Sequence, residues 1–541
     1  MKNIETIRNE IILEVLRKRG ISEEYLDYML NATVMDLEDP LNIEGIRESV
    51  EIIEKHIRNR NKILIHGDYD ADGITSLALL YRTLSHIYDE SKIIPYIPDR
   101  FMEGYGFSEK SIELAKREGV GLIITVDCGI TAIEEVKKAI DEGIEVIITD
   151  HHEPLDILPK ASSIVHPKIG KSHKLVYLTG VGVVYKLVSA LYKKFNKSMN
   201  LLLWDLDLVA IGTIADMGDL VYENRILTKY GIIVLNKSKK AGIKAIKYIS
   251  GINGKILPWH ISFIIAPRIN AAGRMATPDY AFKLLISKDG EEVLRISNLL
   301  NKLNLNRQME QKKIMKGAIK QAIENLDRYV LVLSDWGWHE GVIGIVASKI
   351  AEIFYRPVIV ISKLGEISKG SCRSIEGFHI QKALSKLSHL LEEFGGHKMA
   401  GGFTIKTENI ELFKNEIEKI AKNEIKEEQL KRVYDYETEI KAEDINRNFI
   451  LDYIKLSPFG IGNEHFRFLH KNLKVISVNK SKNNMEILFS NGKLTLKSKI
   501  SNINEEWLNL KAGDIVDLIF QFSDNFLNKD SLNISALKFI K

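Results

Sequence analysis

Carboxylates and imidazoles follow three short, β-branched segments of the chain. Segment 62–68 leads into Asp68, Asp70 and Asp72, segment 122–127 ends in Asp127, and segment 145–150 ends in Asp150, followed by His151 and His152. In a parallel sheet the C-terminal ends of the strands lie at one edge, where open α/β folds bind ligands. We therefore expect these side chains to gather in one crevice. Crowded carboxylates need cations between them, and imidazole beside carboxylate suits manganese better than calcium.

A purely structural interpretation competes with this one for single residues. An aspartate directly after a strand usually caps a helix or forms a turn, which would account for Asp127 or Asp150 alone. Asp68 fits a turn as well as it fits a metal site. The same explanation does not easily cover three strand ends together with a histidine pair, so the set as a whole favours a metal site.

The elements that must position these residues alternate between strand and helix. Strand-like segments are found at 62–68, 92–98, 122–127, 145–150 and 162–167. Helix-like segments at 74–88 and 131–142 lie between them. This alternation predicts a parallel sheet with helices on both faces.

Four further regions follow this first α/β region. Residues 180–250 read mostly as helix, and a long helical stretch at 291–326 would reach roughly 50 Å as a rigid connector between domains. Strand-like segments at 329–334, 357–362 and 402–406 predict a second α/β unit. Five short strands between 473 and 540 suggest a small β-barrel.

The composition is that of a globular protein with several domains. Of 541 residues, 45% are hydrophobic and 27% charged, and the net charge of +4 is too small to indicate nucleic-acid binding by itself. Residues 471–500 nevertheless hold seven lysines and one acid, which suits either phosphate binding or a solvated face. No apolar run of about 18 residues occurs, the N-terminus lacks a signal-peptide core, and only two cysteines are present. We therefore expect a cytoplasmic protein without a membrane partner.

Four motifs resemble the signature of the DHH phosphoesterase superfamily. Three of them are HGDYDADG at 66–73, TVDCG at 125–129 and TDHHE at 149–153. IGTIADMGDL at 211–220 looks like the fourth motif, which would add Asp216 as a metal ligand. Without this resemblance, Asp216 would be interpreted as a helix-terminal residue.

The resemblance narrows to the bacterial RecJ family of single-strand-specific exonucleases and runs over essentially the whole chain. Its further motifs are IPDRFMEGYGFS at 97–108, APRINAAGRM at 266–275, FGGHKMAGGF at 394–403 and SPFGIGN at 457–463. The chain departs from the family after Asn463, where Glu464 stands instead of the common proline, which affects only a barrel turn.

The resemblance implies a fold of three domains. A DHH parallel-sheet domain and a DHH-associated α/β domain would be joined by a long helix and followed by an OB-fold β-barrel. The expected boundaries are an N-terminal helical segment at 1–60, the DHH domain at 61–285, the connector helix at 286–327, the DHH-associated domain at 328–430 and the OB-fold at 431–541.

The resemblance also implies the chemistry, in which two Mn²⁺ or Mg²⁺ ions activate water for attack on a phosphodiester. The implied metal ligands are Asp70, Asp72, Asp127, His151 and Asp216. His66 is either a further ligand or a residue that hydrogen-bonds to a ligand without contacting the metal. His152 would contact the scissile phosphate, and Asp150 would orient a histidine. Cys128 is better explained as a small buried residue.

The glycine-rich motif and several arginines are the expected substrate contacts. Glycines let main-chain N–H groups approach a phosphate, and arginine binds phosphate in a bidentate manner. The implied residues are Ser371, Arg373, Gly396 and His397, which should face the metal crevice, and Arg100, Arg268, Asn270 and Arg274. A hinge or surface ion pairs would be the structural alternatives. Phe459, Phe466 and Phe468 could stack bases, although barrel core explains them better.

The implied function is 5′→3′ exonucleolysis of single-stranded DNA in repair and recombination, with release of 5′-mononucleotides. Single-stranded DNA is the expected partner, with a helicase and a single-strand-binding protein implied only by family, and the domain set resembles a monomeric enzyme. The alternatives are a phosphodiesterase of short oligonucleotides or cyclic dinucleotides, a pyrophosphatase, and a DNA-binding scaffold that has lost catalysis. The scaffold is disfavoured because every expected ligand is present.

Overall fold

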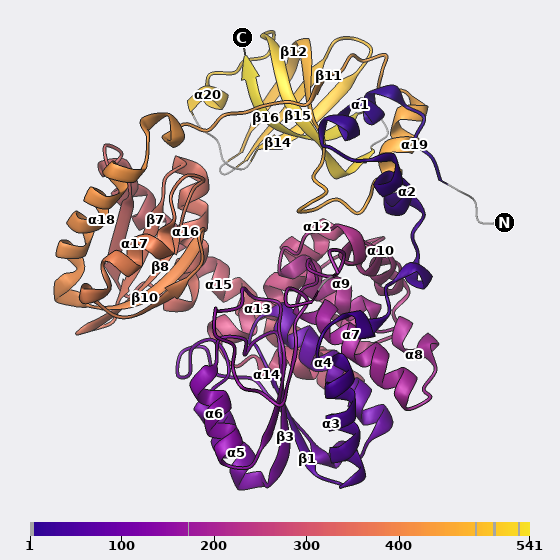
Figure 1. The fold of residues 1–541 in the computed structure, drawn as a ribbon. Coiled ribbons are helices and arrows are strands. Elements are labelled where there is room, and N and C mark those ends of the chain that lie inside the picture. The colour runs from indigo at the N-terminus through magenta and orange to yellow at the C-terminus, as the bar shows by residue number, and fades with distance from the viewer. Residues whose placement is uncertain (1–4, 171, 482–483, 501–504, 528–530, 541) are drawn as a thin grey trace. The chain divides into compact units, whose positions relative to one another are not determined.

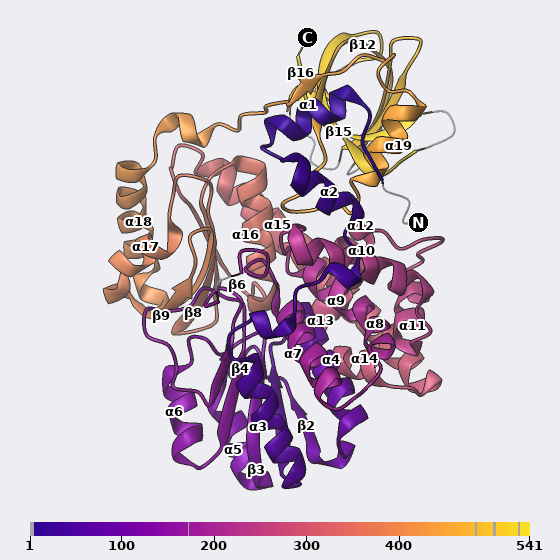
Figure 2. The ribbon, with the colours of Figure 1, turned by 45° about the vertical axis from the view of Figure 1, so that its right-hand side comes forward.

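The computed structural model describes residues 5–170, 172–481, 484–500, 505–527 and 531–540. The chain forms two compact units. Unit 1 comprises Met1–Asn301 and Asp435–Lys541, and unit 2 comprises Lys302–Tyr434. Figures 1 and 2 show the elements of each unit. Among the described helices, none is both long enough and apolar enough to cross a membrane.

The first half of unit 1 is built on a five-stranded parallel sheet in the order β2-β1-β3-β4-β5. Its strands are β1 (Lys62–Gly67), β2 (Ile93–Tyr96), β3 (Val120–Val126), β4 (Glu145–Thr149) and β5 (Ser163–Val165). The chain places β2 on one side of β1 and β3 on the other. The strand order therefore reverses at β1, and this is the point at which open α/β sheets bind ligands.

Helices cover both faces of this sheet, which explains why its strands are almost continuously apolar. Helices α5 (Glu109–Glu118) and α6 (Ile133–Asp141) contact each other and the sheet on one face, where they share a core with β3 and β4. Helices α3 (Ile46–Arg58), α4 (Ala71–Ile87) and α7 (Gly180–Lys194) pack on the other face. The parallel sheet expected from the alternating pattern is confirmed.

A helical layer follows the sheet in the chain and carries the fourth motif. It consists of α8 (Met199–Leu203), α9 (Leu206–Ala215), α10 (Tyr222–Lys237), α11 (Ala241–Ile249), α12 (Pro258–His260), η4 (Ile261–Ile265), α13 (Ala266–Met275) and α14 (Asp279–Ile286). Helix α9 is buried on every side from Leu206 to Ile214 and packs against α4, α7 and α10. Its end therefore holds Asp216 at a fixed place beside α4.

The C-terminal part of unit 1 is a closed five-stranded barrel. Strands β12 (Arg467–Lys480), β13 (Met485–Ser490), β14 (Thr495–Ile500), β16 (Leu532–Ile540) and β15 (Ile515–Leu527) pair in that order, and β15 pairs back with β12. Strand β14 pairs with β16 in parallel, and the other barrel pairs are antiparallel. The short strand β11 (Thr438–Glu439) and helix α19 (Arg447–Lys455) flank the barrel. The expected OB-fold is confirmed.

The N-terminal helices complete the core of the barrel. Apolar residues of α1 (Glu10–Lys18), including Ile12 and Val15, share one hydrophobic cluster with Phe466 and Phe468 of the barrel. Helix α2 (Glu23–Asn31) adds Leu30 to the same cluster. Phe466 and Phe468 are 0% exposed, so the expectation that they are barrel core is confirmed.

Unit 2 contains a mixed five-stranded sheet in the order β6-β7-β8-β10-β9, in which only β6 and β7 are parallel. Its strands are β6 (Leu331–Trp336), β7 (Val358–Lys363), β8 (Ile367–Arg373), β9 (Leu391–Gly396) and β10 (Ala400–Lys406). Its helices are α16 (Glu340–Phe354), α17 (Ile380–Lys386) and α18 (Ile410–Glu424). The long helix expected at 291–326 is observed as α15 (Gly290–Glu324).

Candidate metal centre

The strand ends at the reversal point of the sheet bring carboxylates and imidazoles together. Candidate ligand atoms lie within 4.8 Å of one another in three overlapping groups among the described residues. The groups are Asp68, Asp70 and Asp127; Asp72, His151 and Asp216; and Asp127, His151 and His152. Asp127 and His151 each belong to two groups, so the three groups form one continuous cluster.

The first motif is held in place by helix N-termini. Asp70 caps α4, because its Oδ1 accepts hydrogen bonds from the N–H groups of Asp72 at 2.9 Å and Gly73 at 3.1 Å. The carboxylate of Asp72 accepts the N–H groups of Gly180 at 2.8 Å and Val181 at 3.0 Å, at the start of α7. Unpaired N–H groups at a helix start favour an anion, so both carboxylates are fixed before any cation binds.

Asp127 has a strained main chain, and two glycines lie against the carboxylates of Asp127 and Asp72. Its φ of 62° is in the left-handed region, which costs roughly 1–3 kcal/mol for a non-glycine residue and is common at functional sites. A Cβ at Gly180 would lie 2.3 Å from Asp127 Oδ1, and one at Gly212 would lie 2.5 Å from Asp72 Oδ1. Close packing of the carboxylates therefore requires glycine at both positions.

Burial and mutual repulsion make these carboxyl groups weak acids. Burial, followed by the charge of Asp70, raises the pKa of Asp72 to about 7. The same two causes raise the pKa of Asp68, and burial together with neighbouring carboxylates raises the pKa of Asp127 and Asp216 well above the ordinary value. Oδ1 of Asp68 and of Asp127 and Nε2 of His151 are buried without a hydrogen-bond partner.

The two adjacent histidines have opposite protonation behaviour. Burial and the neighbouring His152 charge lower the pKa of His151 to about 3, which leaves its imidazole neutral and able to bind a metal. Burial alone would lower the pKa of His152, but its 2.7 Å hydrogen bond with Asp150 Oδ1 outweighs burial and raises that pKa to about 9. His152 is therefore a cation at neutral pH.

Asp150 is the anchor of the histidine pair. Its Oδ2 accepts the N–H of Ile130 at 2.9 Å, and its Oδ1 accepts the N–H of His151 at 2.7 Å. Burial would raise the pKa of Asp150, but the bond and charge of His152 and the Ile130 N–H outweigh burial and lower it. The carboxylate thus stays ionised and orients the His152 ring.

The structure places His66 apart from the three groups. Its ring is 0% exposed and lies between Tyr96 and Phe107, with Nε2 3.1 Å from the carbonyl of Gly106. Nδ1 is buried without a partner. His66 could therefore still support the centre, but its role as a ligand stays a prediction.

The predicted substrate contacts of unit 1 lie in two places. The Arg100 guanidinium stacks over the ring of Tyr69, 4.9 Å from the ring centroid. Tyr69 directly follows Asp68 in the chain. Arg268 donates to the carbonyl of Ile264 at 2.7 Å and to Asn301 at 3.1 Å. Asn270 and Arg274 lie further along α13, and Oδ1 of Asn270 is buried without a partner.

The predicted substrate contacts of unit 2 converge at one end of its sheet. Ser371 and Arg373 are two positions apart on β8, where Arg373 pairs with Ala400 of β10. The hairpin of β9 and β10 brings His397 to the same end, since its N–H donates to the Ala400 carbonyl at 2.7 Å. Gly396, with φ 143°, leads into this turn, and a Cβ there would lie 2.4 Å from that carbonyl.

Two residues of the site, Asp68 and Tyr105, are not clearly predicted from the sequence. Asp68 fits a turn equally well in the sequence, whereas its side chain is 3% exposed and belongs to one of the groups. The hydroxyl of Tyr105 lies 3.0 Å from Nδ1 of His152, although the two residues are 47 positions apart in the chain. Position 68 carries a signal, as the first carboxylate after the strand. Tyr105 lies within the family-like motif at 97–108, but nothing in that motif points to a contact with His152.

Three family models match successive parts of the chain. The N-terminal domain model of the DHH family matches residues 62–213, the DHHA1 domain matches 327–423, and the RecJ OB domain matches 436–535. The crystal structure of RecJ in complex with Mn²⁺ from Thermus thermophilus matches with a TM-score of 0.83 and 28% identity, over 98% of this chain and 75% of that chain.

Two relatives of similar sequence are also RecJ proteins. The single-stranded-DNA-specific exonuclease RecJ of Bacillus subtilis is 38% identical over 91% of this chain and 62% of the relative. The protein of the same name from Haemophilus influenzae is 33% identical over 77% of this chain and 76% of the relative. The chain thus spans about three fifths of the length of the Bacillus subtilis relative.

Proposed function

This chain belongs to the RecJ family, and we propose that it is a 5′→3′ exonuclease specific for single-stranded DNA. It would hydrolyse phosphodiester bonds with two divalent metal ions and release 5′-mononucleotides in DNA repair and recombination. The observation that carries the proposal is the continuous cluster of carboxylates and imidazoles at the reversal point of the parallel sheet.

The residues of the cluster fit divalent cations. Three buried ligand atoms, on Asp68, Asp127 and His151, have no hydrogen-bond partner, and the carboxyl groups cannot all ionise without added positive charge. Carboxylate oxygens suit both Mn²⁺ and Mg²⁺, and of these two ions Mn²⁺ accepts an imidazole nitrogen more readily. The proposed holders are Asp70, Asp72, Asp127, His151 and Asp216, with Asp68 added by the geometry and His66 in support.

Two such ions, when bound, supply Lewis acidity to the phosphodiester and to an attacking water. Side chains of the protein would stabilise the charge that develops on the phosphate. Cationic His152 donates from its ring to a phosphate oxygen as negative charge builds up there, and Asp150 holds the ring in place through Nδ1. Because Asp150 is itself held by three main-chain N–H groups, those of Ile130, His151 and His152, the donor is positioned before the substrate arrives.

The remaining predicted residues would bind the strand. Arg100, Arg268, Asn270 and Arg274 would recognise the phosphate at the 5′ end, and Ser371, Arg373, Gly396 and His397 would hold the terminal nucleotide. Arg100 next to the cluster and the exposed glycine hairpin of unit 2 support these roles. Arginine makes bidentate contacts to phosphate, which lysine cannot reproduce.

The proposed cellular setting rests on resemblance to the family. We propose that the protein acts as a monomer in the cytoplasm on single-stranded DNA, and that a helicase and a single-strand-binding protein prepare its substrate. Two rival functions are phosphodiesterase activity on short oligonucleotides and a non-catalytic scaffold. The scaffold is opposed by the intact ligand set, and the short-substrate enzyme by the terminal barrel.

One assay separates these functions. Single strands labelled at the 5′ or the 3′ end, a duplex, a dinucleotide and pyrophosphate are each incubated with the protein and Mn²⁺. Rapid mononucleotide release from the 5′ end of single strands alone supports the proposal. Preference for dinucleotide, or no turnover of any substrate, contradicts it in favour of the corresponding rival.

A further inference from the structure

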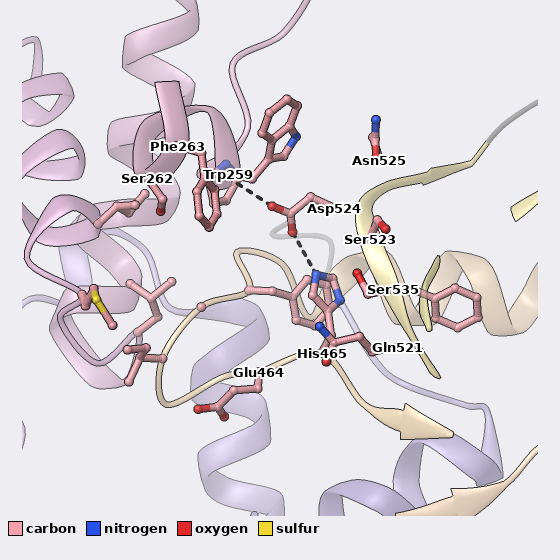
Figure 3. A pocket seen from close by; sticks show the side chains of 18 of the residues that line it. Trp259, Ser262, Phe263, Glu464, His465, Gln521, Ser523, Asp524, Asn525 and Ser535 are labelled. Carbon is pink, nitrogen blue, oxygen red and sulfur yellow. Dashed lines mark hydrogen bonds and ion pairs between the residues drawn. The ribbon is translucent and has the colours of Figure 1, made fainter. Parts of the chain in front are cut away.

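Unit 1 contains a cavity of about 840 Å³ that we name the barrel pocket. One wall is formed by residues 214–220 and by α12 and η4, including Ser262 and Phe263, as Figure 3 shows. The opposite wall belongs to the barrel and includes His465, Gln521 and Asp524. The pocket therefore lies between the helical layer that carries Asp216 and the barrel.

Both walls are fixed to each other by hydrogen bonds. The two carboxylate oxygens of Asp524 accept the N–H of Trp259 at 3.2 Å and bond Nε2 of His465 at 2.9 Å. The N–H of Leu220 donates to the carbonyl of Ile461 at 2.7 Å at another edge of the pocket. The cavity is consequently a built feature of the fold, with polar groups at defined positions.

The lining of the barrel pocket combines apolar contact surface with uncommitted polar groups. Phe263 is 75% exposed and Met217 is 67% exposed, although both are large and apolar. Gln521, Ser523 and Ser535 line the pocket without a side-chain hydrogen bond to any described residue. A flat ring with hydrogen-bonding edges would satisfy both kinds of group.

The charge of the lining argues against a phosphate as the occupant. No lysine or arginine is found among the described residues that line the pocket, whereas Glu464 and Asp524 are acidic. Sites that track a nucleic-acid backbone are basic, while unpaired bases stack on aromatic rings and bond through their edges. The pocket chemistry therefore suits a nucleobase.

The position of the pocket connects it to the metal centre. Ala215, Met217 and Gly218 line the pocket, and Asp216 between them belongs to the ligand group with Asp72 and His151. We propose that the barrel pocket is a base subsite, in which an unpaired base of the strand 3′ of the scissile phosphate packs on Phe263. This inference rests on the proposed exonuclease function, and the pocket would serve as one point that holds the strand during repeated cleavage.

The test is a double-mutant cycle between the side chain and the base. Single strands with one abasic site, moved stepwise from the 5′ end, are cleaved in Mn²⁺ by the wild type, by Phe263→Ala and by Tyr248→Ala. Tyr248 is an equally exposed aromatic residue on α11 of the same unit, at 79%, and serves as the matched control. Equilibrium binding of the same strands, followed by fluorescence anisotropy, is measured in parallel.

At one position, loss of the base should weaken wild-type binding and kcat/KM by about fivefold or more, the scale of one base–aromatic stack. Phe263→Ala should show the same loss with an intact strand and no further loss with that abasic strand. Two results would overturn the inference: additive losses at every position, or binding and kcat/KM of Phe263→Ala equal to those of Tyr248→Ala. A peptide would then be the alternative occupant of the pocket. Failure of the exonuclease function itself would appear separately, as intact strands in the wild-type reaction, while the binding cycle still tests the pocket.

Discussion

Nε2 of His151 and Oδ1 of Asp127 lie 3.2 Å apart, and neither atom has a hydrogen-bond partner among the described residues. They do not form an ion pair at neutral pH, because the pKa of His151 falls to about 3 while burial and neighbouring carboxylates raise that of Asp127. Two unpartnered ligand atoms at this separation are costly in a buried site. Divalent cations bound at the cluster would satisfy both atoms, which leads to the first prediction.

Mn²⁺ binding should release protons at pH 7. Asp72, with its pKa raised to about 7, is partly protonated there, and the pKa values of Asp68, Asp127 and Asp216 are also raised by burial and repulsion. A bound cation favours the ionised forms, so protons leave the carboxyl groups as the metal binds. Calorimetric titration in two buffers of different ionisation enthalpy should give different apparent binding enthalpies. Identical enthalpies in both buffers would contradict the protonated cluster.

Gly180→Ala should abolish most of the activity. The new Cβ would lie 2.3 Å from Asp127 Oδ1, so that carboxylate must move, and a displacement of about 1 Å can cost on the order of 100-fold in rate. Gly182→Ala on the same helix is the control, since its Cβ meets the end of the Leu178 side chain at 3.0 Å and no ligand. Rates in Mn²⁺ and melting temperatures should separate the two variants. Equal rates would show that Asp127 tolerates displacement.

The parallel sheet and the metal cluster could be predicted because their signals are local. Strands buried on both faces leave apolar runs, and Asp70, Asp127 and His151 stand directly at their ends. Strands β8 and β9 were missed because ISKGSCR and LEEFGG are rich in serine and glycine, and their strand structure comes from pairing with β10. The contact of Tyr105 with His152 arises from folding of a distant loop, which leaves no periodic signal.

Arg225→Ala should destabilise unit 1. The Arg225 side chain is 1% exposed, and its guanidinium donates to four main-chain carbonyls, those of Met29, Leu456, Ser457 and Pro458. These contacts join α10 to the N-terminal helices and to the segment before the barrel. Removal takes this donor from the carbonyls of Met29 and Ser457, whereas those of Leu456 and Pro458 keep the side-chain amide of Asn463, and we expect a cost of about 3–5 kcal/mol. Chemical denaturation should show this loss, whereas Arg295→Ala at an exposed position of α15 should stay near the wild type.

Asp452→Asn should lose stability at neutral pH but not in acid. Asp452 accepts the N–H groups of Arg8 at 2.7 Å and Asn9 at 2.9 Å and pairs with Lys455. Burial would raise the pKa of Asp452, but the Lys455 bond and these N–H groups outweigh burial and lower it below 3.8. A lowered folded-state pKa gives stability that is complete above the unfolded value of about 3.9 and is lost as pH falls through the folded value.

The stability difference between wild type and Asp452→Asn should therefore be constant from pH 7 to about pH 5 and shrink below about pH 4. At neutral pH it should be about 1 kcal/mol, because a charged acceptor is replaced by a neutral one. Urea unfolding at several pH values measures this difference. A stability difference that grows in acid would contradict the lowered pKa of Asp452 in the folded protein.

Two lysines of the barrel should contribute to the salt dependence of DNA binding. Lys471, Lys493 and Lys497 pair with acids, whereas Lys474 and Lys499 make no ion pair within the described part of the chain. Replacing both with glutamine should reduce the slope of log affinity against log salt by about 1.4, at about 0.7 for each phosphate contact on a single strand. Lys471→Gln and Lys493→Gln form the matched control. An unchanged slope in the Lys474 and Lys499 variant would exclude this face from binding.

The central claim, that the strand-end cluster holds two divalent cations, is tested most directly by anomalous diffraction at the manganese edge from crystals grown with MnCl₂. Two peaks are expected, one contacting Asp68, Asp70 and Asp127 and the other contacting Asp72, His151 and Asp216. No peak at these residues, or peaks only elsewhere on the protein, would contradict it.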